Sequence, residues 1–187
     1  MSDLEKNFDA AANVIKSGGV IAYPTEAVWG LGCDPFNLNA VNTIIQLKQR
    51  SSEKALILIA SDVSQLGQIY FSLTPAQQLC LVAPRDNPTT WLIQDIHNHI
   101  PKIIKGPYLS VAVRITNHPD VVALCDVFGG MIVSTSANTG GNKPATSLSQ
   151  VKSYFGTDVD YYLNGTLGSS TKPSQIVDLM SGEIVRS

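Results

Sequence analysis

The stretch Ser110-Val111-Ala112-Val113-Arg114-Ile115-Thr116 is the clearest strand signal in this chain, and it decides the fold class. Branched apolar residues alternate there with small or polar ones, and successive side chains of a strand point to opposite faces of a sheet. One face therefore belongs to the core. The other carries two hydroxyls, an alanine methyl and Arg114, a combination that suits a polar ligand lying over a sheet. Because an unpaired buried charge is costly, Arg114 needs a partner or a cleft.

The segments on either side of this strand alternate between strand and helix patterns. The apolar run Ala55–Ala60 predicts a central strand that is covered on both faces. A short strand begins at Val20 and ends at Pro24, because proline cannot donate to a ladder. Further strands are predicted at 89–93, 131–133, 159–163, 175–179 and 183–186, and helices at 4–16, 39–48, 62–70, 74–82, 119–128 and 148–155. This alternation predicts an α/β fold, with helices packed on a sheet.

Two connections and two helix N-caps complete this prediction. The glycines of Trp29-Gly30-Leu31-Gly32 predict a turn after the first strand. Asn39 is the predicted N-cap of the second helix, and Asp62 that of a helix reaching Tyr70. Residues 97–107 are predicted to form a loop.

Length and composition favour one domain over residues 1–187. The 187 residues are 44% hydrophobic, which is enough for one sizeable core. The formal net charge of -2 predicts no whole-molecule attraction to nucleic acid, so any RNA contact must be local. The first residues lack a basic and apolar leader pattern, and no apolar run approaches the roughly 18 residues of a membrane span. We therefore expect a cytoplasmic protein with no membrane association.

The cysteines and histidines predict neither a disulfide framework nor a metal site. Cys33, Cys80 and Cys125 are widely spaced and odd in number. The last two lie in apolar stretches and are expected to be buried, inert thiols, whereas Cys33 follows the glycine-rich segment close to the predicted site. His97 and His99 have no cysteine or carboxylate at ligand spacing.

Phosphate loops, dinucleotide fingerprints, serine elbows and zinc-protease motifs are all absent from the sequence. What remains is a set of hydroxyl, amide and cationic residues at strand ends, each able to hold an anion: Thr25, Lys48, Arg50, Lys54, Ser110, Arg114, Ser134, Ser136, Asn138, Ser174 and Arg186. Arginine grips phosphate or carboxylate with two hydrogen bonds, and lysine supplies a point charge. The residues alone therefore predict an anion site without naming its ligand.

Each member of this set also has a purely structural explanation. Lys48 and Arg50 end a predicted helix, where cations favour the helix dipole. Lys48 and Lys54 taken singly would be solvated surface residues, and Ser134–Ser136 would be a turn with capping hydroxyls. The set as a whole carries more weight than its members.

Five motifs in order make the chain resemble the YrdC-like threonylcarbamoyl-AMP synthase family, from about Gly18 to Arg186. They are Ile21-Ala22-Tyr23-Pro24-Thr25-Glu26-Ala27-Val28-Trp29-Gly30-Leu31-Gly32, Lys48-Gln49-Arg50 with Lys54, Ser110–Arg114, Ser134-Thr135-Ser136-Ala137-Asn138, and Ser174-Gln175-Ile176-Val177-Asp178. The resemblance is to the short, single-domain bacterial form. It implies an open twisted mixed sheet with a concave, positively charged face. Ala27 and Ala55 depart from the threonine and proline of many members.

The resemblance also implies an activity and a division of the site. The family joins L-threonine, bicarbonate and ATP, with Mg²⁺ on the triphosphate, into threonylcarbamoyl-AMP, and downstream transfer proteins place the threonylcarbamoyl group on a tRNA adenosine beside the anticodon. The implied ATP contacts are Arg50, Lys54, Ser110, Ser136, Asn138 and Arg186, and the implied threonine contacts are Thr25, Arg114, Ser134 and Ser174. Lys48 would add positive potential, and it joins Arg50 and Arg114 as the residues expected to drive the chemistry.

Two other functions fit the same residues. The first is a maturation factor that binds double-stranded RNA or tRNA on the same basic face, and its RNA binding would weaken steeply with salt. The net charge disfavours it. The second is a paralogue that shares the fold but acts on another substrate, such as a carbamoyl-transfer module. Threonine-dependent consumption of ATP would distinguish the synthase from this paralogue.

Overall fold

One mixed sheet forms the frame of the structure. The computed structural model describes residues 3–51, 53–170 and 172–186. Within these ranges the strands are β1 (Ile21–Pro24), β2 (Trp29–Gly32), β3 (Ile57–Ala60), β4 (Thr89–Gln94), β5 (Ser110–Ile115), β6 (Ile132–Ser136), β7 (Tyr161–Tyr162), β8 (Gln175–Asp178) and β9 (Ile184–Arg186). The helices are α1 (Asp3–Lys16), α2 (Leu38–Leu47), α3 (Gln68–Phe71), α4 (Pro75–Val82), α5 (Lys102–Lys105), α6 (Pro119–Phe128) and α7 (Leu148–Phe155), with a 3-10 helix η1 (Val63–Leu66).

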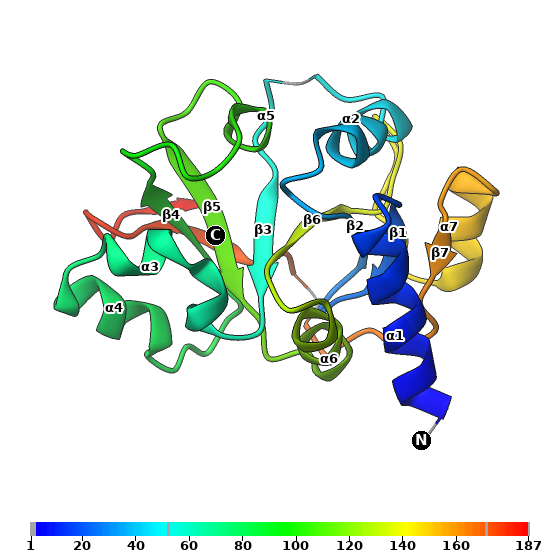
Figure 1. The fold of residues 1–187 in the computed structure, drawn as a ribbon, viewed down its shortest axis with the longest axis horizontal. Helices are drawn as coiled ribbons and strands as arrows, with labels where there is room; N and C mark the ends of the chain where they lie inside the picture. Colours follow the sequence, from blue (N-terminus) through cyan, green and yellow to red (C-terminus); the bar gives the residue numbers. More distant parts are fainter. Residues whose placement is uncertain (1–2, 52, 171, 187) are drawn as a thin grey trace.

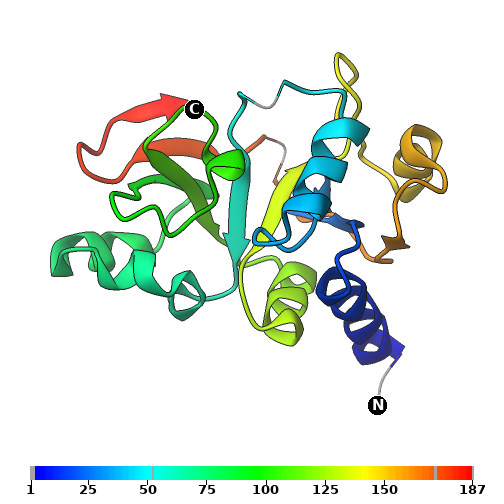
Figure 2. The same cartoon turned by 45° about the horizontal axis from the view of Figure 1, so that its top comes forward.

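The strands lie in the order β7-β1-β2-β6-β3-β5-β4-β8-β9. Strand β3 pairs in parallel with β5 and antiparallel with β6, so the sheet is mixed, as predicted. Both ribbon views place α7 and the α3–α4 pair at opposite ends of the molecule, with α1 beside α6 between them (Figure 1 and Figure 2). The C-terminal hairpin of β8 and β9 lies toward the α4 end in both views. Among the described helices, none is both long and apolar enough to cross a membrane.

The core consists of two clusters of buried residues. In the smaller one, α1 and α6 pack over Ile21, Tyr23, Ile59 and Ile132 of strands β1, β3 and β6. The larger cluster includes residues of β2, β4, β5, β8 and the remaining helices, and Val111 and Val113 of β5 belong to it, as the alternating pattern of that strand predicts.

The segment Trp29–Gly32 is strand β2, and the predicted turn there is wrong. It pairs antiparallel with β1 and with β6, and all four of its residues are buried. Glycine is required at position 32 because a Cβ atom there would lie 2.7 Å from the Val133 carbonyl oxygen and 2.8 Å from the Tyr23 ring. These glycines therefore allow close strand packing. The local sequence alone does not distinguish such packing from a turn.

Three other boundaries differ from the predictions. Asn37, not Asn39, caps α2, and its side chain accepts from the backbone N–H groups of Asn39 and Ala40. The expected 62–70 helix is divided at Gly67, whose φ of 53° is a left-handed value that interrupts a helix. The expected 97–107 loop contains α5.

Candidate functional site

A cavity of about 560 Å³ opens on the polar face of the central strands. Strand register builds its floor, because residues directly opposite each other in paired strands point to the same side of a sheet. Leu92 of β4, Ala112 of β5, Ile57 of β3 and Ser134 of β6 form one such row, and all four line the cavity. Ile59 lies on the same face as Ile57 but is covered by α6. The cavity is therefore the part of this face that the helices leave open.

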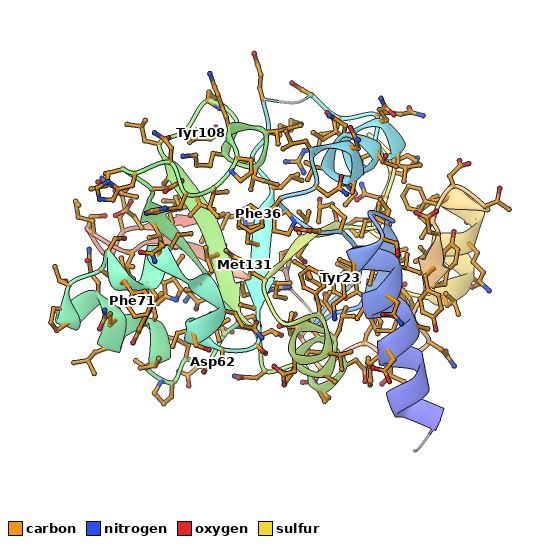
Figure 3. The ribbon with its side chains drawn as sticks, in the orientation of Figure 1. Tyr23, Phe36, Asp62, Phe71, Tyr108 and Met131 are labelled. Carbon is orange, nitrogen blue, oxygen red and sulfur yellow. The ribbon has the colours of Figure 1, made fainter. Side chains whose placement is uncertain are left out.

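Most of the predicted polar set lines this one cavity. Its lining includes Thr25, Arg50, Lys54, Ser110, Arg114, Ser134, Ser136, Ser174 and Arg186. Within the part of the chain that the structure describes, the side chains with formal charge in the lining are Glu26, Arg50, Lys54, Arg114, Lys172 and Arg186. Tyr108, on the loop after α5, also borders the cavity, whereas the exposed Phe71 on α3 is not part of its lining and lies apart from Tyr108 (Figure 3). Basic groups outnumber acidic ones, so the cavity suits an anionic ligand.

Arg50 is fixed at one side of the cavity by contacts with its neighbours. Its Nη2 donates to the Ala55 carbonyl oxygen at 2.7 Å and its Nη1 to Thr135 Oγ1 at 3.3 Å. Burial lowers the pKa of the guanidinium below its usual value. The buried Nε of Arg50 has no hydrogen-bond partner among the described residues. The side chain is thus held in place while part of its donor capacity is unused, which suits recognition of phosphate.

Arg114 lies at the floor of the cavity, where it is 8% exposed. Its Nη2 is 3.2 Å from Oε2 of Glu26, and the other carboxylate oxygen of Glu26 accepts from Thr116 Oγ1 at 2.7 Å. The partner that the sequence pattern demanded for Arg114 is therefore Glu26, a residue that does not belong to the polar set predicted from the sequence. The signal was present, since Glu26 follows Thr25 where the first strand leaves the sheet.

The hydroxyls around Arg114 are engaged with the protein itself. Thr25 Oγ1 donates to the Val28 carbonyl oxygen at 2.7 Å, which closes the short connection between β1 and β2. The Ser174 and Thr90 hydroxyls are 2.7 Å apart. Arg186 Nη2 donates to the Ser174 carbonyl oxygen at 2.8 Å, and this contact joins the last strand to the cavity wall. A ligand would therefore meet hydroxyls that already have fixed directions.

Lys48 and Asn138 lie beneath the cavity lining. The Lys48 ammonium donates to the Ser136 carbonyl oxygen, to the Asn138 carbonyl oxygen at 3.0 Å and to Asn138 Oδ1 at 3.1 Å. Lys48 is only 5% exposed, and desolvation, with a smaller effect of Arg50, lowers its pKa to about 8. The structure thus brings these two residues to each other, and neither belongs to the described lining of the cavity.

The cysteines lie outside this cavity in the described chain. Cys33 and Cys125 are buried, and burial raises the pKa of both thiols, that of Cys125 to about 12. Cys80 is half-buried and accepts from Arg85 Nη2 at 3.3 Å, so the expectation that it is buried is wrong. The rings of His97 and His99 are 5.6 Å apart. In the described ranges, no three histidine, cysteine or acidic side chains gather as metal ligands.

Comparison with known proteins gives consistent results. Residues 13–187 match the sequence model of the Sua5_yciO_yrdC family, described as "Telomere recombination". The chain is 48% identical over 182 residues to a threonylcarbamoyl-AMP synthase of Acinetobacter baumannii, covering 94% of this chain and 95% of the relative. It is 44% identical over 183 residues to the threonylcarbamoyl-AMP synthase of Cellvibrio japonicus, covering 98% and 96%. The structure of P. abyssi Sua5 complexed with L-threonine superimposes with a TM-score of 0.85 at 26% identity, covering 96% of this chain and 53% of that one.

Proposed function

The chain belongs to the Sua5/YciO/YrdC family, and from this premise we propose that it is a threonylcarbamoyl-AMP synthase. The reaction joins L-threonine, bicarbonate or CO₂, and ATP, and it releases pyrophosphate. We propose that residues 1–187 act as one domain in the cytoplasm. The product would supply downstream proteins that transfer the threonylcarbamoyl group to a tRNA adenosine.

The single observation that carries this proposal is that Arg114 and Arg50 line one cavity of about 560 Å³. An amino acid needs a group for its carboxylate, and a nucleotide needs cations for its phosphates. The volume falls within the range of roughly 300–1,000 Å³ that is typical of small-molecule sites. We assign Arg114 to the threonine carboxylate, with Thr25, Ser134 and Ser174 around it. The phosphate side consists of Arg50, Lys54, Ser110, Ser136 and Arg186.

The proposed chemistry needs no nucleophile from the protein. The threonine amine adds to CO₂ and loses a proton, and an oxygen of the resulting carbamate attacks the α-phosphorus of ATP as pyrophosphate leaves. Arg114 would hold the amino acid in line with this attack, which converts an encounter into a positioned reaction. Arg50 and Lys54 would neutralise the charge that builds on the phosphate oxygens. A serine nucleophile or a general-base histidine is therefore not required.

Mg²⁺ would arrive with ATP as part of the substrate. Glu26 is the carboxylate of the described cavity lining, and it is already engaged by Arg114 and Thr116. Mg²⁺ is commonly bound through one or two carboxylates together with substrate phosphates. Here the triphosphate would supply most of its ligands. The donor set thus fits a metal that is held by the nucleotide rather than by a protein cage.

Product analysis tests the function directly. The protein is mixed with ATP, L-threonine, bicarbonate and Mg²⁺, and the nucleotides are separated and identified by mass spectrometry. We expect threonylcarbamoyl-AMP and pyrophosphate, and neither when threonine is omitted. ATP consumption that does not depend on threonine would favour the paralogue with another substrate. Salt-sensitive binding of double-stranded RNA without any ATP binding would favour the maturation factor.

A further inference from the structure

We propose that Lys48 is a positioning residue, which holds the loop after β6 from beneath and so keeps Ser136 in the cavity lining, and that it does not touch the ligand. The inference rests on the proposed function only in taking ATP as the ligand of that cavity. It concerns a lysine that sequence reasoning placed among the groups that act on the triphosphate.

The first argument is the complete use of the ammonium group. An ammonium has three N–H donors and no acceptor. Lys48 directs them to three oxygens of one short segment, namely the carbonyls of Ser136 and Asn138 and the Asn138 side-chain oxygen. A phosphate could be bound only by breaking one of these hydrogen bonds in a site where Lys48 is 5% exposed.

The second argument is the set of hydrogen bonds that the Asn138 side chain makes. Its Oδ1 accepts from Lys48 and also from the Ser136 hydroxyl at 2.6 Å. Its Nδ2 donates to the Asn142 carbonyl oxygen at 2.8 Å. Asn138 thus links the lysine to Ser136, which lines the cavity, and to the turn that follows. Loss of the ammonium would remove the charged partner that holds the Asn138 amide in place, and Ser136 would lose the fixed position of its own hydrogen-bond acceptor.

The third argument is the packing of the two segments. Lys48 is the C-cap residue of α2, and Gln49 after it adopts a left-handed φ of 48°. A Cβ atom on Gly140 would lie 3.1 Å from the Gln49 carbonyl oxygen and 3.4 Å from that of Lys48. The loop after β6 therefore rests directly on the end of α2, and Arg50 emerges into the cavity from the same end. Lys48 connects the two segments that carry Arg50 and Ser136.

A double-mutant cycle on ATP binding tests this role. The proteins are the wild type, Lys48→Met, Asn138→Ala and the double variant, and the dissociation constant of ATP is measured by calorimetry. If Lys48 acts through Asn138, each single variant weakens ATP binding about tenfold, and the double variant is no weaker than the worse single one. If Lys48 binds phosphate directly, the two factors multiply, which would overturn the inference. Lys54→Met, which changes a cavity-lining cation, is the control whose factor should multiply with that of Asn138→Ala.

Steady-state kinetics supply the second readout. With Lys48→Met we expect KM for ATP to rise about tenfold while KM for threonine changes less than about twofold. A general loss of folded protein would lower the apparent kcat and leave both KM values unchanged, and that result would also count against the proposal.

A third measurement uses the wild type alone and needs no catalytic turnover. In the wild type, the titration of the Lys48 side chain is followed by NMR of its ε carbon, with and without ATP. A lysine in contact with a triphosphate would titrate at a markedly higher pH when ATP is bound, whereas a positioning lysine would shift little.

If the wild type binds no ATP, the proposed function fails, and hydrogen exchange then decides the inference alone. The Ala145 and Asn142 amides donate to the Ala137 and Thr139 carbonyl oxygens of the loop after β6. Faster exchange of these amides in Lys48→Met supports the inference, and unchanged exchange overturns it.

Discussion

Nη2 of Arg114 lies 3.2 Å from Oε2 of Glu26, and both residues border the same cavity. The protein thus provides a carboxylate at the place where the proposed amino-acid substrate would bring its own. The Thr116 hydroxyl holds the other oxygen of Glu26, so the pair has a defined geometry before any ligand binds. Substrate binding at Arg114 can then use Nε, which has no hydrogen-bond partner among the described residues, on a guanidinium that Glu26 already holds.

Arg114→Lys tests the recognition of the substrate carboxylate. Lysine keeps the charge but lacks the planar pair of donors, so we expect KM for threonine to rise about tenfold or more. KM for ATP should change less than about twofold. Arg85→Lys is the matched control, since Arg85 lies over the Trp91 ring outside this cavity. Equal increases of both KM values in Arg114→Lys would contradict the assignment.

Glu26→Gln tests whether the carboxylate orients Arg114. Glutamine keeps the size of the side chain and an oxygen that can accept from Thr116, but it loses the charge that attracts the guanidinium. We expect kcat/KM for threonine to fall about tenfold, a loss of about 1.4 kcal/mol, because Arg114 loses the ion pair that holds it. Steady-state kinetics at varied threonine concentration measure the effect. An unchanged kcat/KM would mean that Arg114 is held by its strand alone.

Gly32→Ala tests the close packing of β2. The added methyl group would meet the Val133 carbonyl oxygen at 2.7 Å and the Tyr23 ring at 2.8 Å, and neither can move easily because both belong to the buried sheet. Overpacking of this kind costs about 1–3 kcal/mol of unfolding free energy. Denaturant unfolding measures it. Gly130→Ala is the control, since a methyl group there approaches nothing closer than 3.7 Å, and a similar loss in both variants would refute the explanation.

The lowered pKa of Lys48 predicts two pH trends of opposite sign, one in the stability of the fold and one in ATP binding. Burial lowers the pKa of Lys48 to about 8 in the folded protein, below the value near 10.4 of an unfolded chain. Between these values the unfolded chain binds more protons than the folded one, so the contribution of Lys48 to stability rises with pH. Over the same interval the neutral amine has two donors for three oxygens, and ATP binding should weaken. Unfolding and calorimetry at pH 7 to 10 check both trends, and Lys48→Met should lack both.

The elements that were predicted correctly carry their signals within a few residues. In α4, Thr74 and Gln77 form a capping box and Pro75 is the first helical residue, all of which is visible locally. Strand β2 could not be predicted this way, because Gly32 is required by Val133, a residue about a hundred positions away. Glycine is equally compatible with a turn and with close strand packing, and only the paired strands distinguish the two.

The same limit applies to the site. Arg114 could be predicted from the sequence because it is a charged residue within an apolar strand and therefore needs a partner. The direction of the Lys48 side chain was not, since its acceptors lie 88 and 90 residues further along the chain, at the end of β6 and on the loop after it. Glu26 was missed because a single carboxylate after Thr25 has no meaning until β1 and β5 are placed in one sheet.

The row formed by Leu92, Ala112, Ile57 and Ser134 has a consequence for how the protein tolerates insertions and deletions. Four strands from distant parts of the sequence contribute one residue each, and a slip of one residue in any of them would turn its contribution to the opposite face. Length changes in the connections should therefore be absorbed, whereas a single residue added inside one of these strands would dismantle the cavity floor without removing any catalytic group. The number of residues along each strand therefore matters to the site as much as the identity of those residues.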